Sequence, residues 1–153
     1  MKHTYQTVLV GIDGSSQAKE AFEKAVEVAR RNEGRVIVAT IVDQQASAPM
    51  GFGALSESII EQEQAEAEQM IQEAKDYAAS VGFANVEGVV AFGSAKPALA
   101  RKLPQEYNVD LIVIGQSGLN AVERFITGSV ASYVIREAPC DVLVVTPSVE
   151  EAE

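Results

Sequence analysis

The chain has 153 residues, a length typical of one domain with a single compact core. Its formal net charge of −10 argues against nucleic acid and anionic membranes as partners, because both are recruited by clustered lysine and arginine. A single cysteine, Cys140, excludes a disulfide within the chain, and nowhere do about 18 apolar residues run together. We therefore expect a soluble protein of the reducing cytosol.

Apolar runs and helical periods alternate along the first half of the chain. Residues 7–13 (TVLVGID) are a nearly continuous apolar run and predict a buried strand. Residues 15–32 follow with apolar side chains at helical spacing, and Gly34 stands just past the end of the predicted helix. Residues 35–43 then predict a second buried strand.

A long second helix is predicted after a loop. Residues 44–54 are rich in glycine and small residues without periodicity, which predicts the loop. Helical spacing returns from residue 55 to about residue 80, with many glutamates opposite the apolar stripe, and these indicate a solvated face. The stripe consists of Ile59, Ala67, Met70, Ile71, Ala74, Tyr77 and Ala78.

The second half continues the alternation. Residues 85–92 predict a third strand and residues 110–115 a fourth. Residues 94–107 between them predict a helical segment, with Pro97 in its first turn and Pro104 near its end.

The last elements complete an α/β pattern. The sequence predicts a helix over residues 128–137 and a fifth strand over residues 140–147. Five apolar strands separated by helices predict right-handed crossovers and one parallel sheet covered on both faces, the doubly wound α/β class. We assign residues 1–147 to one domain and the acidic residues 148–153 to a disordered tail.

A glycine-rich stretch, IGQSGLNAVERFITGS (114–129), follows the fourth strand. In a doubly wound sheet, ligands bind outside the carboxyl ends of the strands, where the strand order reverses. Gly115 and Gly118 permit turns or a close backbone approach, and Gly128 and Ser129 would open the next helix, whose free N–H groups favour an anion. The stretch therefore predicts a phosphate site.

The roles within this site follow from chain order. Gly115 and Gly118 could contact the ribose and the nearer phosphates, while Gly128, Ser129 and Val130 could offer N–H groups and a hydroxyl to the terminal phosphates. The spacing is not that of a P-loop, and no lysine occurs after residue 102. On spacing alone, ordinary turn and cap glycines are an equal alternative.

Three segments resemble the universal stress protein family across nearly the whole chain: VLVGIDGS (8–15), DLIVIGQSG (110–118) and GSVASYVIREAPCDVLVV (128–145). Residues 115–129 also match the signature of the family's ATP-binding branch, which is G, two residues, G, nine residues, then G and a small hydroxyl residue. The resemblance implies a Rossmann-like sheet of order 3-2-1-4-5, similar to adenine nucleotide alpha hydrolases.

The resemblance also implies a nucleotide lying across the first and fourth strand ends. Asp13 would contact the adenosine, with Gly11 and Ile12 lining the pocket. Ile41 would pack on adenine, or Val42 if the strand register differs by one residue. The ligand would be ATP, ADP or AMP, with Mg²⁺ possible beside ATP and held by Asp13 through water.

Simpler roles compete for two of these residues. Asp13 could instead cap the following helix or accept from nearby backbone N–H groups, although Ser15 or Ser16 could take the capping role. Ser129 could be a helix cap only.

The sequence supports several functions. It shows no nucleophile with a general base, so we assign no catalytic residue and leave open whether the chain is an enzyme. The first hypothesis is a nucleotide-dependent switch in a stress response. The alternatives are a slow ATPase or self-phosphorylating enzyme, and an interaction module with a structural nucleotide. The apolar last strand, residues 140–146, and the family resemblance predict a homodimer through that strand.

Overall fold

The computed structural model describes residues 4–43, 57–116 and 128–146. The strands are β1 (Thr7–Gly11), β2 (Arg35–Val42), β3 (Val86–Phe92), β4 (Leu111–Gly115) and β5 (Asp141–Val145). The helices are α1 (Ser16–Arg31), α3 (Glu57–Ser80), α4 (Ala95–Pro97), η1 (Ala98–Lys102), α5 (Leu103–Tyr107) and α6 (Ser129–Glu137). The predicted loop 44–54 and tail 148–153 lie outside the described residues.

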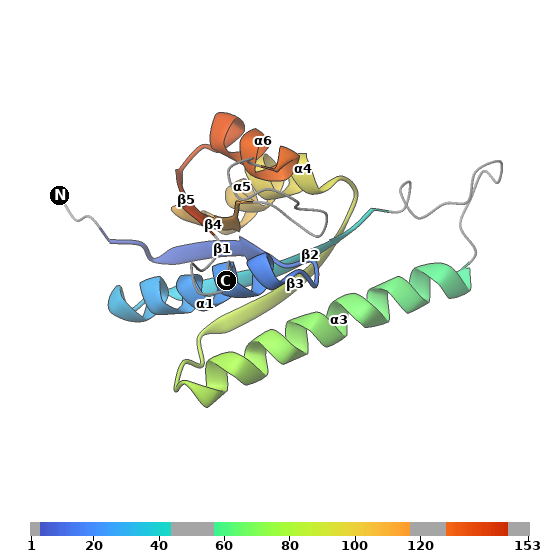
Figure 1. The fold of residues 1–153 in the computed structure, drawn as a ribbon, viewed down its shortest axis with the longest axis horizontal. Helices are drawn as coiled ribbons and strands as arrows, with labels where there is room; N and C mark the ends of the chain where they lie inside the picture. Colours follow the sequence, from blue (N-terminus) through green and yellow to red (C-terminus); the bar gives the residue numbers. More distant parts are fainter. Residues whose placement is uncertain (1–3, 44–56, 117–127, 147–153) are drawn as a thin grey trace, which may run out of the picture.

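The strands form one parallel sheet in the order β3-β2-β1-β4-β5, which confirms the predicted class and strand order. In the register, Leu9 of β1 lies opposite Ile37 of β2 and Ile112 of β4. Helices α1 and α3 lie on one face of the sheet, and α4, α5 and α6 lie on the other (Figure 1). The strand order reverses between β1 and β4, which makes their shared carboxyl end the expected ligand position.

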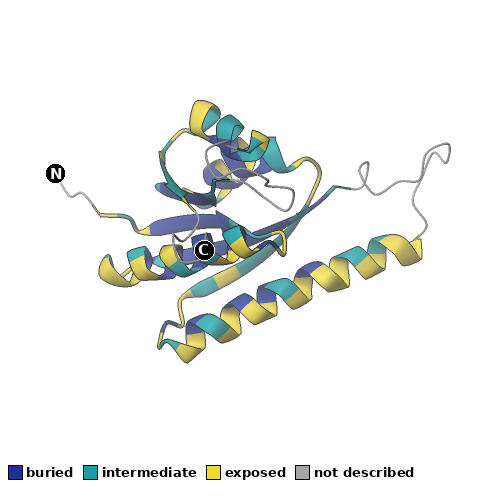
Figure 2. Ribbon diagram, in the orientation of Figure 1, coloured by how far each residue is buried: buried dark blue, intermediate teal, exposed yellow. Residues whose placement is uncertain are grey.

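The side chains of each strand pack alternately into two separate cores, because successive side chains of a strand point to opposite faces of the sheet. Val8, Val36 and Val113 pack on what we call the α1 face, with buried residues of α1 and α3. Leu9 and Ile37 pack on what we call the α6 face, with residues of η1, α5 and α6. The central strands are consequently buried on both sides (Figure 2).

Different local hydrogen bonds mark the beginning and the end of helix α1. The hydroxyl of Ser15 accepts from the N–H of Ala18 at 3.1 Å, so Ser15 is the N-cap. At the other end, Glu33 takes the left-handed conformation (φ 55°), and the Gly34 N–H donates to the Ala29 carbonyl at 2.8 Å. The left-handed residue at the end of α1 is thus Glu33, and Gly34, which follows it, serves a different purpose.

Gly34 is a point of close approach between two backbones. A Cβ placed on it would lie 2.7 Å from the carbonyl oxygens of both Tyr5 and Gln6. The Arg35 N–H donates to the Gln6 carbonyl at 2.9 Å and holds the two segments together. Gly34 therefore lets the chain that enters β2 lie against the chain that enters β1.

Helix α3 is only partly packed. Its buried residues are Ala67, Ile71, Ala74 and Ala78. The start of the helix extends past the sheet and is mostly exposed, and Ile59 is 36% exposed there (Figure 2). The predicted apolar stripe is thus buried only from Ala67 onward.

The predicted helical segment 94–107 contains one wider turn. Helix η1, a π-helix, separates α4 from α5. Pro104, the second residue of α5, has no N–H to donate to the carbonyl four residues earlier, which favours the wider turn. Leu99, Ala100 and Leu103 still reach the α6-face core.

The helices that the structure describes include none with the length and apolar character needed to cross a membrane.

Candidate functional site

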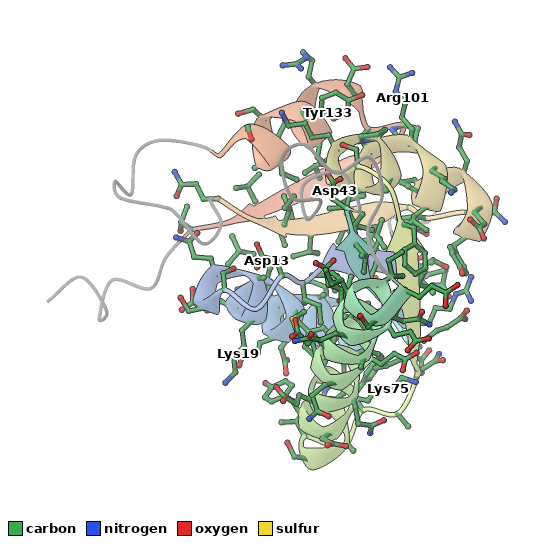
Figure 3. All side chains as sticks on the ribbon, turned by 90° about the vertical axis from the view of Figure 1, so that its right-hand side faces the viewer. Asp13, Lys19, Asp43, Lys75, Arg101 and Tyr133 are labelled. Atoms are coloured by element: carbon green, nitrogen blue, oxygen red, sulfur yellow. The ribbon has the colours of Figure 1, made fainter. Side chains whose placement is uncertain are left out.

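The carboxyl edge of the sheet carries most of the predicted site residues. Figure 3 views the molecule from this side and shows Asp13 after β1 and Asp43 after β2. Ile12 continues the edge of β1, since its N–H donates to the Ala39 carbonyl at 2.8 Å. The β1–α1 loop therefore starts from a fixed position beside β2.

Asp13 is exposed in this loop and does not cap α1, since Ser15 does. One oxygen of the Asp13 carboxylate, Oδ1, accepts from the Ser15 N–H at 2.9 Å. This is the local bond that the simpler interpretation predicted. The bond uses one oxygen and holds the carboxylate at the end of β1, and the second oxygen has no hydrogen-bond partner among the described residues.

Two glycines of the predicted site have packing roles of their own. A Cβ on Gly11 would lie 2.9 Å from a methyl carbon, Cδ1, of Leu99. A Cβ on Gly115 would lie 3.1 Å from the backbone oxygen of Gln17 in the first turn of α1. Both positions are half-buried, and close packing of neighbouring elements is enough to explain a glycine at each.

Gln116 joins the end of β4 to the beginning of α6. Its N–H donates to the Val145 carbonyl at 3.0 Å and so extends the pairing of β4 with β5 by one residue. Its own carbonyl accepts from the Gly128 N–H at 2.7 Å. This second bond brings the two ends of the glycine-rich signature together, although residues 117–127, with Gly118, lie outside the described part of the chain.

The amino end of α6 presents free donors at this edge. Gly128 is the extended N-cap (φ −63°, ψ 161°), and the Ser132 N–H makes the first bond of the helix, to the Gly128 carbonyl at 2.9 Å. The N–H groups of Ser129 and Val130 therefore have no partner within the helix. Because the Gly128 N–H is already bonded to Gln116, the predicted donation from Gly128 to a phosphate would require that bond to break.

The side chains at the start of α6 differ in environment. Ser129 is exposed, and no side chain caps the helix. Val130 packs its side chain against the α6-face core, so only its backbone faces a ligand. On β2, Ile41 is half-buried and packs on the same α6 face, whereas Val42 is buried at 5% exposure and belongs to the opposite face by alternation.

A groove of about 460 Å³ lies on the other side of the β1–α1 loop, between α1 and α3. Ile12, Phe22, Met70 and Tyr77 are among the residues that line it, and Ile12 is its only predicted site residue. Within the described residues, no group of three or more His, Cys, Asp or Glu side chains could hold a metal ion. Asp13 is thus a single carboxylate rather than part of a metal cluster.

The parallel sheet, with a helix amino end and a carboxylate at its switch point, places the chain in the doubly wound α/β class. The chain belongs to the universal stress protein family, whose model matches residues 4–146. A Staphylococcus haemolyticus protein named for this family is 42% identical over 142 residues, which cover 93% of this chain and 85% of the relative. A Staphylococcus aureus protein named likewise is 41% identical over 142 residues, covering 93% and 84%.

Solved structures agree with this assignment. The universal stress protein UspA from Lactobacillus plantarum superposes with a TM-score of 0.83 at 28% identity, covering 94% of this chain and 99% of that one. A universal stress protein crystallised in complex with cAMP superposes with a TM-score of 0.73 at 29% identity, covering 95% and 99%. The family resemblance noted in the sequence is thereby confirmed.

Proposed function

We propose that this protein binds an adenine nucleotide, ATP in the first place, across the carboxyl ends of β1 and β4, and that occupancy acts as a switch in a stress response. The observation that carries the proposal is the meeting of β1, β4 and the amino end of α6 at one edge, held by the bond between the Gly128 N–H and the Gln116 carbonyl. A carboxylate and free helical N–H groups are thereby available to one ligand.

Each part of the nucleotide has a matching group. The N–H groups of Ser129 and Val130 and the Ser129 hydroxyl suit the phosphates, since the helix dipole favours an anion there. The free oxygen of Asp13 suits a sugar hydroxyl, with Gly11 and Ile12 beside it. Ile41 offers an apolar surface to the base. Gly115 would contribute its backbone, since α1 occupies the space beside it, and Gly118 is a predicted contact outside the described residues.

The metal requirement is small. Mg²⁺ usually keeps several waters and uses one or two carboxylates plus phosphate oxygens. Asp13 alone, acting through water, fits that pattern, so Mg²⁺ would arrive with ATP rather than occupy a site of its own. The solved relative in complex with cAMP supports an adenine nucleotide as the ligand class.

Calorimetric titration of nucleotide-stripped protein with Mg-ATP tests the proposal. The wild type should bind saturably, Gly118→Val should not bind, and Ser129→Ala should bind roughly fivefold more weakly because one hydrogen bond to phosphate is lost. Ser80→Ala is the matched control, since Ser80 lies at the end of α3 and donates to the Tyr77 carbonyl. Absence of binding by a folded wild type would refute the proposal.

We also infer a homodimer through β5. Among the described strands, β5 pairs only with β4, which leaves its other edge without a partner. Its residues 142–145 are half-buried valines and leucine, too apolar for a solvated edge. Antiparallel pairing with β5 of a second copy would satisfy both edges in an isologous contact. Sedimentation as a monomer at micromolar concentration would refute this arrangement.

A further inference from the structure

We propose that Gln116 determines sugar specificity, by accepting a hydrogen bond from a ribose hydroxyl of the bound nucleotide. This inference rests on the proposed nucleotide site and adds one residue and one selectivity to it. The signature does not specify a residue type at this position, so the sequence gives no reason to single out Gln116.

An orphaned oxygen is the first observation. The side-chain oxygen Oε1 of Gln116 is buried and has no hydrogen-bond partner among the described residues. A buried acceptor without a donor is costly, and native proteins rarely leave one unless another molecule completes it. Thr40 also has a buried oxygen without a partner, but alternation from Ala39 places Thr40 on the α1 face.

Strand alternation places Gln116 on the side where α6 begins. Ile112 and Ile114 belong to the α6-face core, and Gln116 is the next residue of that series. Its backbone is still paired with β5 at this point, which preserves the alternation. The Gln116 side chain therefore lies on the face of the sheet from which the free N–H groups of α6 arise.

Gln116 and Asp13 follow neighbouring strands. Val10 lies opposite Val113, the last pair of the β1–β4 register, and the two chains continue from there to Asp13 and Gln116 on the two sides of the switch point. Alternation from Leu9, which belongs to the α6-face core, places Asp13 on that same face. Two acceptors, one carboxylate oxygen and one amide oxygen, therefore lie on the two sides of the switch point between β1 and β4.

The amide oxygen of Gln116 suits the sugar of the nucleotide better than its phosphates or its base. A carbonyl oxygen only accepts, so its partner must donate, and ionised phosphate oxygens have no proton to give. The base would lie at Ile41 on β2, about two strand spacings from β4, roughly 10 Å away. Ribose carries two adjacent hydroxyls, each of which can donate one hydrogen bond, so it requires two neighbouring acceptors. Asp13 and Gln116 can each take one.

Calorimetric titration with ATP, 2′-deoxy-ATP and 3′-deoxy-ATP tests the assignment. We expect the wild type to bind ATP roughly tenfold more tightly than at least one deoxy analogue, because a site built for a hydroxyl rejects the analogue that lacks it. Gln116→Met should lose that preference, because it weakens ATP and the deoxy analogue that keeps the contacted hydroxyl but leaves the analogue that lacks this hydroxyl unchanged. Gln105→Met is the matched control, since Gln105 is exposed on α5 near the amino edge, and it should keep the full preference.

The outcomes separate this inference from the site itself. If Gln116→Met binds all three nucleotides and prefers ATP over the deoxy analogues as strongly as the wild type does, the role of Gln116 is overturned. The nucleotide site itself would remain. Equal weakening of all three by Gln116→Met would also overturn the role of Gln116, because the loss would not concern the sugar. No binding by folded wild type would refute the proposed function. Gln116→Glu retains an acceptor and should keep the preference, which guards against a folding defect in the methionine variant.

Discussion

At the amino edge of the sheet, side chains bond the backbone groups of neighbouring strands, whereas at the carboxyl edge comparable groups lack partners among the described residues. The Asp110 carboxylate accepts from the N–H groups of Gln6 and Thr7, at 2.9 and 3.1 Å. The Tyr5 hydroxyl donates to the Asp141 carboxylate at 2.7 Å. These bonds attach the chain entering β1 to the beginnings of β4 and β5.

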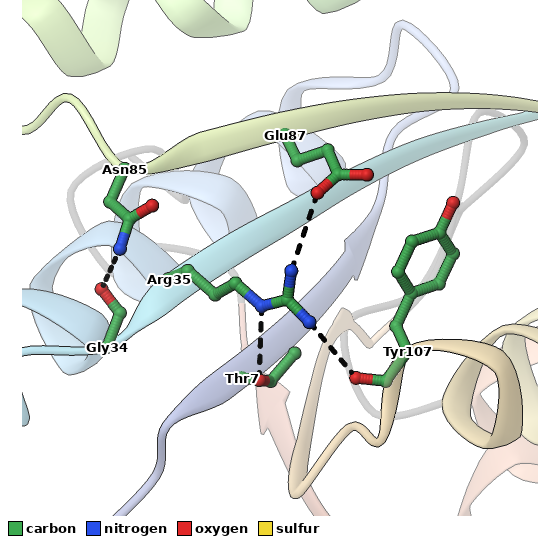
Figure 4. Close-up of polar contacts among 6 residues, drawn as sticks. All are labelled: Thr7, Gly34, Arg35, Asn85, Glu87 and Tyr107. Atoms are coloured by element: carbon green, nitrogen blue, oxygen red, sulfur yellow. Dashed lines mark hydrogen bonds and ion pairs between the residues drawn. The ribbon is translucent and has the colours of Figure 1, made fainter.

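Arg35 extends the amino-edge network across three more elements (Figure 4). Its guanidinium donates to the Thr7 hydroxyl at 3.3 Å, to the Glu87 carboxylate at 3.4 Å and to the Tyr107 carbonyl at 3.3 Å. One side chain thus links β1, β2, β3 and the end of α5. Such a planar group with several donors suits a junction of this kind.

The carboxyl edge has the opposite character. Among the described residues there, Gln116 Oε1 has no partner, and the first N–H groups of α6 have none within the helix. Asp13 is bonded only to its own loop. The difference indicates that the amino edge contributes stability, and it supports the proposal that the carboxyl edge binds a ligand, because unsatisfied polar groups are retained where a ligand completes them. Substitutions at the two edges should therefore affect different measurements.

The largest effect is expected at Gly34 on the amino edge. Gly34→Ala places a methyl group 2.7 Å from two backbone oxygens, which must move apart, so the free energy of unfolding should fall by about 3 kcal/mol. Gly82→Ala is the control, because its Cβ meets nothing within 4 Å and its φ of +80° costs only about 1 kcal/mol. Urea unfolding measures both, and equal losses would contradict the close-approach role of Gly34.

A smaller loss is expected for Asp110. Asp110→Ala leaves the N–H groups of Gln6 and Thr7 without their acceptor, and unfolding should become easier by about 2 kcal/mol. Asp76→Ala on α3 removes only an exposed bond from Gln72 and should cost less than about 0.5 kcal/mol. The dissociation constant for ATP should be the same in both variants. A weakened affinity in folded Asp110→Ala would break the division of roles between the edges.

The sheet could be predicted from the sequence because the apolar residues recur at regular intervals along the chain. Long apolar runs and helical repeats identify strands and helices, and five alternations leave few topologies. The order 3-2-1-4-5 came from the family resemblance, and the structure confirms it. Local departures such as the wider turn of η1 depend on the hydrogen bonds lost at one proline, and periodicity does not record these.

The candidate site was harder to predict because one residue type serves several purposes. Gly11 and Gly115 were assigned to the ligand, but each also lies where Leu99 or Gln17 approaches too closely for a side chain. Gly34 was predicted only to stand just past the end of α1, whereas its close approach to the chain entering β1 appears in the structure alone. Gln116 was missed because an amide side chain signals nothing until its surroundings show that it lacks a partner.

The last effect, which changes stability only above about pH 9, concerns Cys140 at the amino edge. Burial, followed by the charges of Asp110 and Asp141, raises the pKa of the Cys140 thiol from 9.0 to about 11. The thiolate is the reactive form, so the alkylation rate should keep rising through pH 10 and, at pH 8, should be roughly a hundredfold below that of the unfolded chain.

The sign of the accompanying stability change follows from the same shift. A raised pKa in the folded state means that protonated Cys140 favours folding, so its contribution is complete below pH 9 and is lost as the pH rises from about 9 to 11. The free energies of unfolding of wild type and Cys140→Ser should be compared over that interval. Their difference separates the contribution of Cys140 from that of other groups that titrate there. Asp110→Ala should lower the pKa of the thiol, because one nearby negative charge is removed. A rate that levels off by about pH 10 would show a solvated thiol, and the amino edge would then be less closely packed than its hydrogen bonds indicate.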